Sequence, residues 1–483
     1  MNLSQLLRDA DAKHLSGPAD CPITGICYDS RKVQPGCLFV AVKGFRSDGH
    51  AFISKALEQG AAAVLTEQAL PEALPESVAL YQAESTRAAL ARVAAEWYGH
   101  PERELKLVGV TGTNGKTTVT HLVRYILEQN GEKCGLIGTN GVFFGDVARE
   151  SARTTPESLE LYGILREMRE AGMTCAAMEV SSHSLALDRV LGLRFAAAAF
   201  TNLTRDHLDF HGNMDTYFAE KCKLFDRCDT AVINLDDPWG ARLAETCQAA
   251  AITCSAKSDT ADLVAKNVRL LPGGVQAVVV RAYDIARLSM GIPGMFSVYN
   301  ALSAAGCCLA LGLTLEQVCA ALAEAPGIKG RAEIVPTGRD FTVMIDYSHT
   351  PDSMENILRT VRGYAKGRIV GLFGAGGDRD REKRPMMGKI AQEGCDLCIV
   401  TSDNPRSEDP MAIIGDILSG MSGKAKPKVI PDRKEAIAWA VGNAQKDDIL
   451  VLMGKGQETY QEIGGEKLHL DEREEVAKAL SAL

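Results

Sequence analysis

The chain has 483 residues, of which 46% are hydrophobic and 24% are charged, and its formal net charge at pH 7 is −9. These proportions are ordinary for a globular protein, and the acidic balance argues against a general binder of nucleic acids or membrane surfaces. An anionic ligand would therefore need a local pocket of basic side chains or backbone N–H groups.

The length predicts about three domains. Residues 1–9 lack the basic and apolar segments of a secretion signal, and the apolar run at 195–200 is too short to span a bilayer. The fourteen cysteines of so large a chain fit thiols in a reducing compartment better than a disulfide framework. We therefore expect a cytoplasmic protein with no membrane span and no nucleic-acid partner.

The first predicted domain comprises residues 1–98 and is a small α/β unit. Short apolar runs at 37–42 and 61–65 alternate with turns, and residues 52–59 have helical spacing. The segment Trp-Tyr-Gly-His-Pro at 97–101 breaks this pattern and is typical of a linker.

A strand–helix rhythm begins at Leu105 and predicts a second domain over residues 99–330. A valine-rich stretch at 270–287, around a turn at 272–274, predicts a small antiparallel addition, and a helix is expected over 298–311. The sheet should be largely parallel, with strands at 106–110, 174–180, 197–202 and 231–234.

The segment Gly-Ile-Lys-Gly at 327–330 marks a second boundary, after which the rhythm restarts in residues 331–483. This last segment predicts a Rossmann-like, doubly wound domain. In such sheets the functional residues lie at the carboxyl ends of the strands. Strands are expected at 342–346, 368–373, 397–401, 428–430 and 449–453.

The strand at 106–110 runs into a glycine-rich turn at 112–115, and a helix is expected over 117–130. Such a turn lets successive N–H groups point at phosphate oxygens, while Lys116 adds a charge and Thr117 offers a hydroxyl to magnesium. The generic nucleotide motif has a glycine where Val110 stands, and a tight turn without a ligand is the alternative. The pattern predicts binding of ATP or GTP with magnesium by a central P-loop domain.

Acidic and imidazole groups follow two further strands. Glu179 ends one strand, where a carboxylate either holds magnesium or caps a helix. His207 follows the next strand beside two acids, and it is either a metal ligand or a hydrogen-bonded structural group. Lys221 has by itself the pattern of a solvated helix lysine.

The loop Asp403-Asn404-Pro405-Arg406 follows a predicted strand of the last domain. An arginine pairs with a carboxylate, and an acid and an amide can meet an ammonium, so the set suits a zwitterionic amino acid. The alternative is a turn that caps a helix. The glycine-rich segment at 374–380 is a candidate second anion-binding loop.

Taken together and in this order, the motifs resemble those of the Mur ligase family. The segment 112–117 is similar to that family's own phosphate loop, which accounts for Val110. Residues 29–31 and 35–41 resemble the UDP-binding domain of members that add the third peptide residue, and residues 403–406 resemble the signature of members that add diaminopimelate. The other matching segments are 179–183, 201–203, 206–209, 346–351 and 454–456.

The resemblance implies an ATP-dependent carboxylate–amine ligase of peptidoglycan precursor synthesis, and hence a role in cell-wall biogenesis, cell shape and division. ATP would phosphorylate the D-glutamyl carboxylate of UDP-N-acetylmuramoyl-L-alanyl-D-glutamate, and the amine of meso-2,6-diaminopimelate would attack the acyl phosphate. It implies ATP and Mg²⁺ as cofactors and these two compounds as substrates. We expect a monomer.

The resemblance also implies residue roles. The catalytic residues would be Lys116, Glu179, His207 and Lys221, with Lys221 carbamylated to N6-carboxylysine. One magnesium would lie near Thr117 and Glu179, and a second near Glu179 and His207. The implied contacts are Gly112, Thr113, Asn114, Gly115, Lys116, Thr117, Thr118, Asn300 (adenine), Arg331 (phosphates) and Asp346 (ribose) for ATP; Ser30, Thr154, Thr155, Ser181 and Arg189 for the UDP-sugar; and Arg379, Asp403, Asn404, Arg406, Gly454 and Glu458 for diaminopimelate.

Three positions depart from the family pattern: Leu187 and Ser297 stand where some members have glutamine and asparagine, and Gln457 replaces a common histidine. Three alternatives stay open. An L-lysine-adding relative would generally lack the arginine at 406. A folylpolyglutamate synthase-like ligase would have no use for the UDP-type N-terminal segment. A non-catalytic nucleotide-binding paralogue would not need the four catalytic residues.

Overall fold

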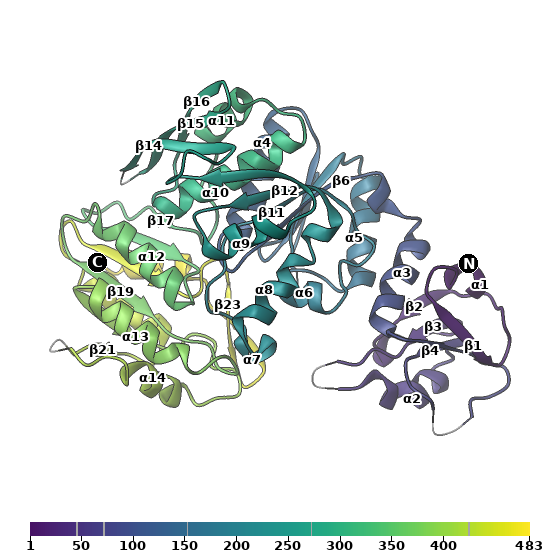
Figure 1. Cartoon of the computed structure of the whole chain (residues 1–483). Helices are drawn as coiled ribbons and strands as arrows, with labels where there is room; N and C mark the ends of the chain where they lie inside the picture. The colour runs from purple at the N-terminus through teal and green to yellow at the C-terminus, as the bar shows by residue number, and fades with distance from the viewer. Residues whose placement is uncertain (45–46, 71–72, 152, 272, 424–425) are drawn as a thin grey trace. The chain divides into compact units, whose positions relative to one another are not determined.

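The computed structural model describes residues 1–44, 47–70, 73–151, 153–271, 273–423 and 426–483. Helices alternate with strands along most of this chain, and the described strands form three larger sheets and one two-stranded hairpin (Figure 1). The predicted α/β class is therefore confirmed. Among the described residues, no helix is both long and apolar enough to cross a membrane.

By its packing, the described chain divides into two compact units. The first comprises Met1–Thr111, Gly131–Ala198 and Lys223–Asp229, and the second comprises Gly112–Asn130, Ala199–Cys222 and Thr230–Leu483. Each predicted segment, 1–98, 99–330 and 331–483, contains one of the larger sheets. The domain boundaries at 98 and 330 stay predictions.

The N-terminal sheet has the strand order β1-β5-β4-β3-β2, with β2 to β5 parallel and β1 antiparallel to β5. Both faces are covered, because alternate residues of β3 enter separate cores: Leu38 and Val40 join one core and Phe39 the other. The predicted runs at 37–42 and 61–65 correspond to β3 and β4, and the predicted helix to α2. The elements are α1 (Leu3–Leu6), β1 (Ala12–Ser16), β2 (Gly25–Cys27), η1 (Ser30–Lys32), β3 (Cys37–Val40), η2 (Gly49–Phe52), α2 (Ile53–Glu58), β4 (Ala63–Thr66), β5 (Ala79–Ala83), α3 (Thr86–Tyr98) and η3 (Pro101–Arg103).

The central sheet has the order β16-β15-β14-β13-β12-β11-β6-β10-β7-β8-β9. All four predicted strands are present, and α10 covers the predicted helix. The valine-rich addition is confirmed as antiparallel strands β14 to β16, although residue 272 of its predicted turn lies outside the described residues. The elements are β6 (Lys106–Thr111), α4 (Lys116–Gln129), β7 (Cys134–Gly138), β8 (Gly141–Phe144), β9 (Val147–Arg149), α5 (Ser158–Glu170), β10 (Cys175–Glu179), α6 (Ser182–Ala186), β11 (Phe195–Phe200), α7 (Leu208–His211), α8 (Met214–Cys222), η4 (Phe225–Arg227), β12 (Cys228–Asn234), α9 (Pro238–Thr246), β13 (Ala250–Ser255), β14 (Leu263–Leu271), β15 (Gly274–Arg281), β16 (Asp284–Met290), α10 (Met295–Ala310) and α11 (Leu315–Ala323).

The C-terminal sheet has the order β17-β18-β22-β19-β20-β21, and each of its five predicted strands is present within one residue at either end. Helices α15 and α16 pack together over a core that includes Val343, Leu372 and Leu450, while α12 packs beside α13 and α13 beside α14 (Figure 1). The elements are β17 (Glu333–Val335), β18 (Thr342–Asp346), α12 (Pro351–Arg362), β19 (Ile369–Phe373), α13 (Lys383–Gly394), β20 (Leu397–Val400), α14 (Pro410–Leu418), β21 (Lys428–Val429), α15 (Arg433–Gly442), β22 (Ile449–Met453), β23 (Tyr460–Ile463), β24 (Glu466–His469) and α16 (Glu472–Ser481).

Candidate functional site

The turn between β6 and α4 requires its glycines. Gly112 and Gly115 have φ angles of +144° and +90°, which residues other than glycine rarely adopt. A Cβ atom at Gly112 would lie 1.9 Å from Thr201 Oγ1, and one at Gly115 would lie 2.4 Å from Asn300 Oδ1. The same geometry brings Asn300, the residue expected at adenine, against the phosphate loop.

The segment after β11 holds this loop in shape. The Asn114 N–H donates to Asn202 Oδ1 at 2.9 Å, and the Asn114 carbonyl accepts from Thr201 Oγ1 at 2.6 Å. The Thr113 N–H donates to the Asn202 carbonyl at 2.9 Å. The Thr-Asn pair that follows β11 is therefore a clamp on the loop, a role that its sequence did not indicate.

Two cations lie at the loop. Lys116 Nζ donates to the carbonyls of Gly112 at 3.0 Å and Thr113 at 2.9 Å. Arg331, expected at the ATP phosphates, donates from Nη2 to Thr117 Oγ1 at 2.8 Å, and its guanidinium stacks 4.6 Å from the Tyr347 ring centroid. Lys116, Thr117 and Arg331 therefore come together, as a triphosphate site would require.

Asp346 ends β18 and lies near Arg331 in space. Its Oδ2 accepts from the Ala332 N–H at 2.7 Å, and its Oδ1 accepts from the Ser348 hydroxyl. Burial raises its pKa above the ordinary value, against the effect of these hydrogen bonds and of Arg331. Its carboxylate is thus fixed at a strand end, where nucleotides bind in such sheets.

Lys221 is buried, with 1% of its surface exposed, so the pattern of a solvated lysine is wrong for this residue. Its Nζ donates to the Gly112 carbonyl at 2.9 Å and lies 4.6 Å from the Tyr217 ring centroid. Burial, and then the charge of Lys116, lower its pKa well below the usual value, although Asp206 acts in the opposite direction. The side chain therefore favours the neutral amine.

Asp206 and His207 form a charged corner of the same unit. Asp206 Oδ1 accepts from the His207 N–H at 3.0 Å, and Oδ2 lies 3.3 Å from His207 Nε2. Burial would raise the pKa of Asp206, but His207, Lys383 and His349 hold it well below its usual range. The Asp206 carboxylate is therefore ionised.

Glu179 lies in the first unit, at the carboxyl end of β10. It pairs in register with Val110 of β6, two residues before Gly112 in the chain. Its Oε1 accepts from the Thr139 N–H at 2.8 Å, and its Oε2 accepts from Thr139 Oγ1 at 3.1 Å. Thr139 follows strand β7, which was not predicted, and so Thr139 was not identified from the sequence.

The donors predicted for magnesium are a hydroxyl, a carboxylate and an imidazole. Within the described residues, no group of three or more His, Cys, Asp or Glu side chains is placed to hold a metal ion. Magnesium needs no such cage, because it usually takes one or two protein carboxylates and completes its shell with phosphate oxygens and water. Thr117, in the second unit, and Glu179, in the first, are each an oxygen donor of the kind that magnesium takes.

Most of the residues that we expect to bind the UDP-sugar lie close together at the carboxyl end of β10. Thr155 Oγ1 donates to the Glu179 carbonyl at 2.9 Å and accepts from the Ser181 N–H at 3.1 Å, and Arg189 Nη1 donates to the Thr155 carbonyl at 3.2 Å. Thr154 Oγ1 lies 3.0 Å from Thr139 Oγ1. Ser30 is buried in η1 of the N-terminal sheet.

A buried carboxylate anchors this group and was missed in the sequence. Glu157 pairs with Arg189 at 2.8 Å and lies 3.5 Å from both Arg87 and Arg153. Three guanidinium groups around one carboxylate leave a local excess of positive charge, which suits an anionic substrate.

The residues expected at diaminopimelate also come together, in the second unit. Asn404 Nδ2 donates to Glu458 Oε2 at 2.9 Å. Gly454 has a φ of +113°, and a Cβ there would lie 2.7 Å from Asp403 Oδ2. Arg406 donates from Nη1 to the Gly377 carbonyl at 2.8 Å and from Nε to Glu462 Oε2 at 3.1 Å.

A buried ion pair links the segment 374–380 to the loop that follows β20. Arg384 has no exposed surface and donates to Glu408 at 2.8 and 3.0 Å, to Asp416 at 2.9 Å and to the Gly376 carbonyl at 3.2 Å. Burial and the charge of Arg406 lower the pKa of Arg379. The segment at 374–380 is thus held by its own side-chain network, with two arginines close together.

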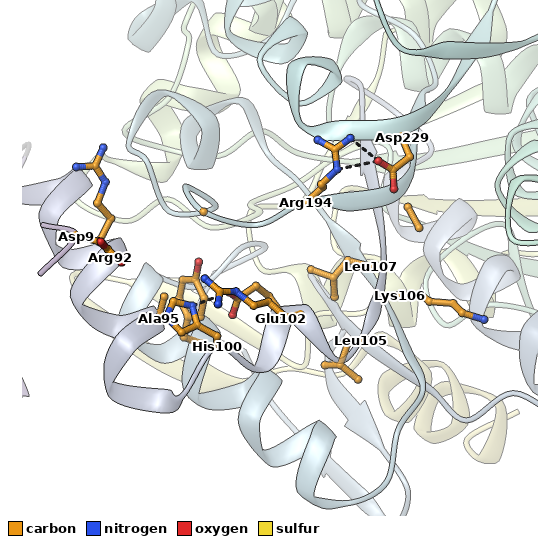
Figure 2. Close-up of a pocket in the computed structure, with 14 residues that line it drawn as sticks. Asp9, Arg92, Ala95, His100, Glu102, Leu105, Lys106, Leu107, Arg194 and Asp229 are labelled. Atoms are coloured by element: carbon orange, nitrogen blue, oxygen red, sulfur yellow. Dashed lines mark hydrogen bonds and ion pairs between the residues drawn. The ribbon is translucent and has the colours of Figure 1, made fainter. Parts of the chain in front are cut away.

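A separate pocket of about 660 Å³ lies in the first unit and contains none of the predicted site residues. Lys106, Arg194 and Asp229 line it (Figure 2). They lie at the amino ends of β6, β11 and β12, whereas Glu179 lies at the carboxyl end of β10. Arg194 Nε donates to Asp229 Oδ1 at 2.8 Å, so part of the lining is already paired.

The phosphate loop and the strand-end carboxylates define a nucleotide-binding α/β enzyme. Comparison with known proteins identifies its family: residues 22–98 match the Mur ligase family catalytic domain, 110–308 the Mur ligase middle domain and 330–456 the Mur ligase glutamate ligase domain. The chain belongs to the Mur ligase family, whose members are ATP-dependent ligases that form amide bonds.

Individual relatives extend over the whole chain. The chain is 46% identical to the UDP-N-acetylmuramoyl-L-alanyl-D-glutamate–2,6-diaminopimelate ligase of Caldanaerobacter subterraneus subsp. tengcongensis, covering 100% of this chain and 99% of that protein. It is 44% identical to the ligase of the same name from Syntrophomonas wolfei, covering 99% of each. A solved structure of a ligase with this name is 31% identical, with a TM-score of 0.68 and 95% of each chain covered.

Proposed function

We propose that this chain is an ATP- and Mg²⁺-dependent ligase that joins meso-2,6-diaminopimelate to the D-glutamate of UDP-N-acetylmuramoyl-L-alanyl-D-glutamate. This reaction is a step of peptidoglycan precursor synthesis. The observation that carries the proposal is the pocket of Asp403, Asn404, Arg406 and Glu458, in a chain whose relatives at 46% and 44% identity bear that name.

The reaction forms an amide in two steps. The terminal phosphoryl group of ATP passes to the D-glutamyl carboxylate and ADP leaves. The amine of diaminopimelate, after losing a proton, attacks the acyl carbon, so that a C–N bond forms and phosphate leaves. Lys116 and Arg331 are suited to neutralise the charge that develops on the phosphoryl oxygens.

The magnesium sites rest on Thr117, Glu179 and His207. A bound Mg²⁺ ion would neutralise phosphate charge. Glu179 is held in place by two hydrogen bonds from Thr139, and the His207 imidazole is oriented by Asp206.

Carbamylation of Lys221 is supported by its burial and by its lowered pKa. A neutral amine can attack the carbon of CO₂, forming an N–C bond and releasing one proton, and the product is an anion. Lys221→Ala should therefore be largely inactive and partly restored by small carboxylates such as formate. An unmodified ammonium in the active enzyme would contradict the assignment.

The substrate and nucleotide contacts follow from the same clusters. Thr154, Thr155, Ser181 and Arg189 would bind the UDP-sugar together with Ser30, and Glu157 would hold Arg189 in place. For ATP, we assign Asp346 to the ribose and Asn300 to the adenine end.

Specificity for diaminopimelate would come from Arg406. Its guanidinium would pair with the carboxylate on the far centre of the amino acid, a group that L-lysine lacks, while Asp403 and Glu458 would meet the ammonium. We expect a cytoplasmic location. We expect a monomer.

The test is phosphate release from ATP by the purified protein, with the UDP-linked dipeptide and one of three acceptors: diaminopimelate, L-lysine or none. We expect release to require the UDP-linked substrate and to be fastest with diaminopimelate. A higher kcat/KM for lysine would assign the chain to the lysine-adding relatives. Turnover with a folate substrate, or none with any acceptor, would contradict the proposed function.

A further inference from the structure

Lys455 follows β22 and Gly454, and it is completely buried. Its Nζ donates to Asn404 Oδ1 at 2.6 Å and to Glu458 Oε2 at 2.9 Å, and it lies 3.5 Å from Asp403 Oδ1. Each of these three side chains was assigned to the amino-acid substrate, whereas Lys455 itself has no exposed surface with which to reach a ligand.

The first consequence concerns the Asn404 amide. Its Oδ1 accepts from Lys455 Nζ and from the Glu462 N–H at 2.9 Å, two groups that can only donate. The amide therefore has one allowed orientation, in which Nδ2 faces Glu458 at 2.9 Å. Because an amide nitrogen carries two hydrogens, Asn404 can also donate to a substrate carboxylate.

The second consequence concerns charge. Asp403 is buried, and burial alone would raise its pKa, but Lys455 and Arg433 hold the pKa below its usual value. Arg433 is itself matched by Glu472 in a fully buried pair at 2.8 Å. Lys455 is therefore the cation that faces these two carboxylates, and the three groups together carry one negative charge, which can meet a substrate ammonium.

We propose that Lys455 is a positioning residue of the amino-acid site, an internal ammonium that turns the Asn404 amide toward the substrate carboxylate and keeps Asp403 and Glu458 together. The inference rests on the proposed function. It differs from it because Lys455 acts only through its neighbours.

The test compares Lys455→Met and Lys455→Gln with the matched control Lys467→Met. Lys467 also lies over the Tyr460 ring, at 4.1 Å against 5.5 Å for Lys455, but it is exposed on β24. We expect Lys455→Met to raise the KM for diaminopimelate about 10- to 100-fold, the range found when a group that orients a metal ligand is removed. Lys455→Gln keeps a donor but loses the charge, so it should raise this KM less. The KM for ATP and for the UDP-linked substrate should change less than about twofold, and the control should match wild type.

A double-mutant cycle identifies the route of the effect. If Lys455 acts through the amide, Lys455→Met, which removes the donor to Asn404, and Asn404→Ala should be strongly non-additive in kcat/KM for diaminopimelate. Gln can still donate to Asn404 and Glu458, so this variant serves if Lys455→Met does not fold, as thermal unfolding would reveal.

The possible failures are distinguishable. If wild type does not use diaminopimelate, the proposed function is wrong. If wild type does, but the Lys455 variants raise all three KM values equally or behave like the control, or the cycle is additive, the positioning role is wrong.

Discussion

Two lysines in the second unit are buried to the same extent but have opposite surroundings. Lys221, on α8, has 1% of its surface exposed and contacts a carbonyl oxygen and an aromatic ring. Lys455, after β22, is fully buried and contacts two carboxylates and an amide oxygen.

The difference shows that the groups in contact with a buried lysine decide its charge state and its role. No carboxylate lies in contact with Lys221 among the described residues, and burial penalises the ammonium, so its pKa is lowered and the neutral amine is favoured. With carboxylates in contact, the ammonium of Lys455 is compensated and gives the pocket its shape. Neither role is visible in the residue type; both follow from the partners.

The largest expected effect concerns the amino-acid pocket, in which Lys455 is paired with carboxylates. Sites built around a polar partner reject analogues that lack it by about 10⁴-fold, so wild type should prefer diaminopimelate to lysine strongly. Arg406→Ala should lower kcat/KM for diaminopimelate far more than for lysine and narrow this ratio. Asn404→Ala should have a smaller effect. An unchanged ratio in Arg406→Ala would contradict this assignment of the loop.

Stability measurements test whether Lys455 and Lys221 differ as their surroundings indicate. Lys455→Met leaves two carboxylates without their cation, and removing one partner of a buried pair costs about 3–5 kcal/mol. Lys221→Met removes an amine whose ammonium form is penalised by burial more than it is favoured by Asp206, so it should be neutral or stabilising. Urea unfolding of both variants at pH 7 in CO₂-free buffer measures the two changes. Destabilisation of equal size in both would show that the two lysines do not differ as proposed.

Lys116→Ala tests the phosphate loop, whose Gly112 carbonyl accepts a hydrogen bond from Lys221. It removes the main positive charge at the phosphate loop, and the loss of one charge-stabilising group costs about 10²- to 10³-fold in turnover. The fold should be unaffected, because the two hydrogen bonds described for Lys116 Nζ go to carbonyls of the loop itself. Near-wild-type turnover at saturating ATP would contradict the phosphate-loop assignment.

Much of the fold could be predicted from apolar periodicity. Five strands of the C-terminal sheet lie within one residue of expectation, because buried parallel strands are continuous apolar runs bounded by turns. The short antiparallel strand β17 of the same sheet was missed. Strands β7 to β9 were missed: β8 and β9 are short and β9 is exposed, whereas β7 is buried but has two glycines among its five residues. The β23–β24 hairpin, which supplies Glu462, is also largely exposed and lacks such a run.

The candidate site could be predicted only where a motif or a family resemblance named the residue. Glycines and Lys116 have a local signature, whereas Thr139, Glu157 and Lys455 act through partners distant in sequence. Lys221 shows the limit most clearly, since helical spacing gave the pattern of a solvated side chain. Burial of a single helix residue depends on tertiary packing, which one sequence does not contain.

The smallest expected effect is the pH dependence of stability contributed by Lys221. Its pKa in the folded protein is well below the value of about 10.4 for an unfolded chain, so between these two values the unfolded state binds more protons. The free energy of unfolding should therefore rise with pH in that window, by up to about 1.4 kcal/mol per pH unit, relative to a variant without the amine. Lys221→Met should lose this increment while retaining the slopes due to other groups. The measurement is urea unfolding of wild type and variant between pH 8 and pH 9.5 (a range set by lysine titration) in CO₂-free buffer. Parallel curves would mean that Lys221 titrates as an ordinary ammonium, and the contrast with Lys455 would then rest on contacts alone.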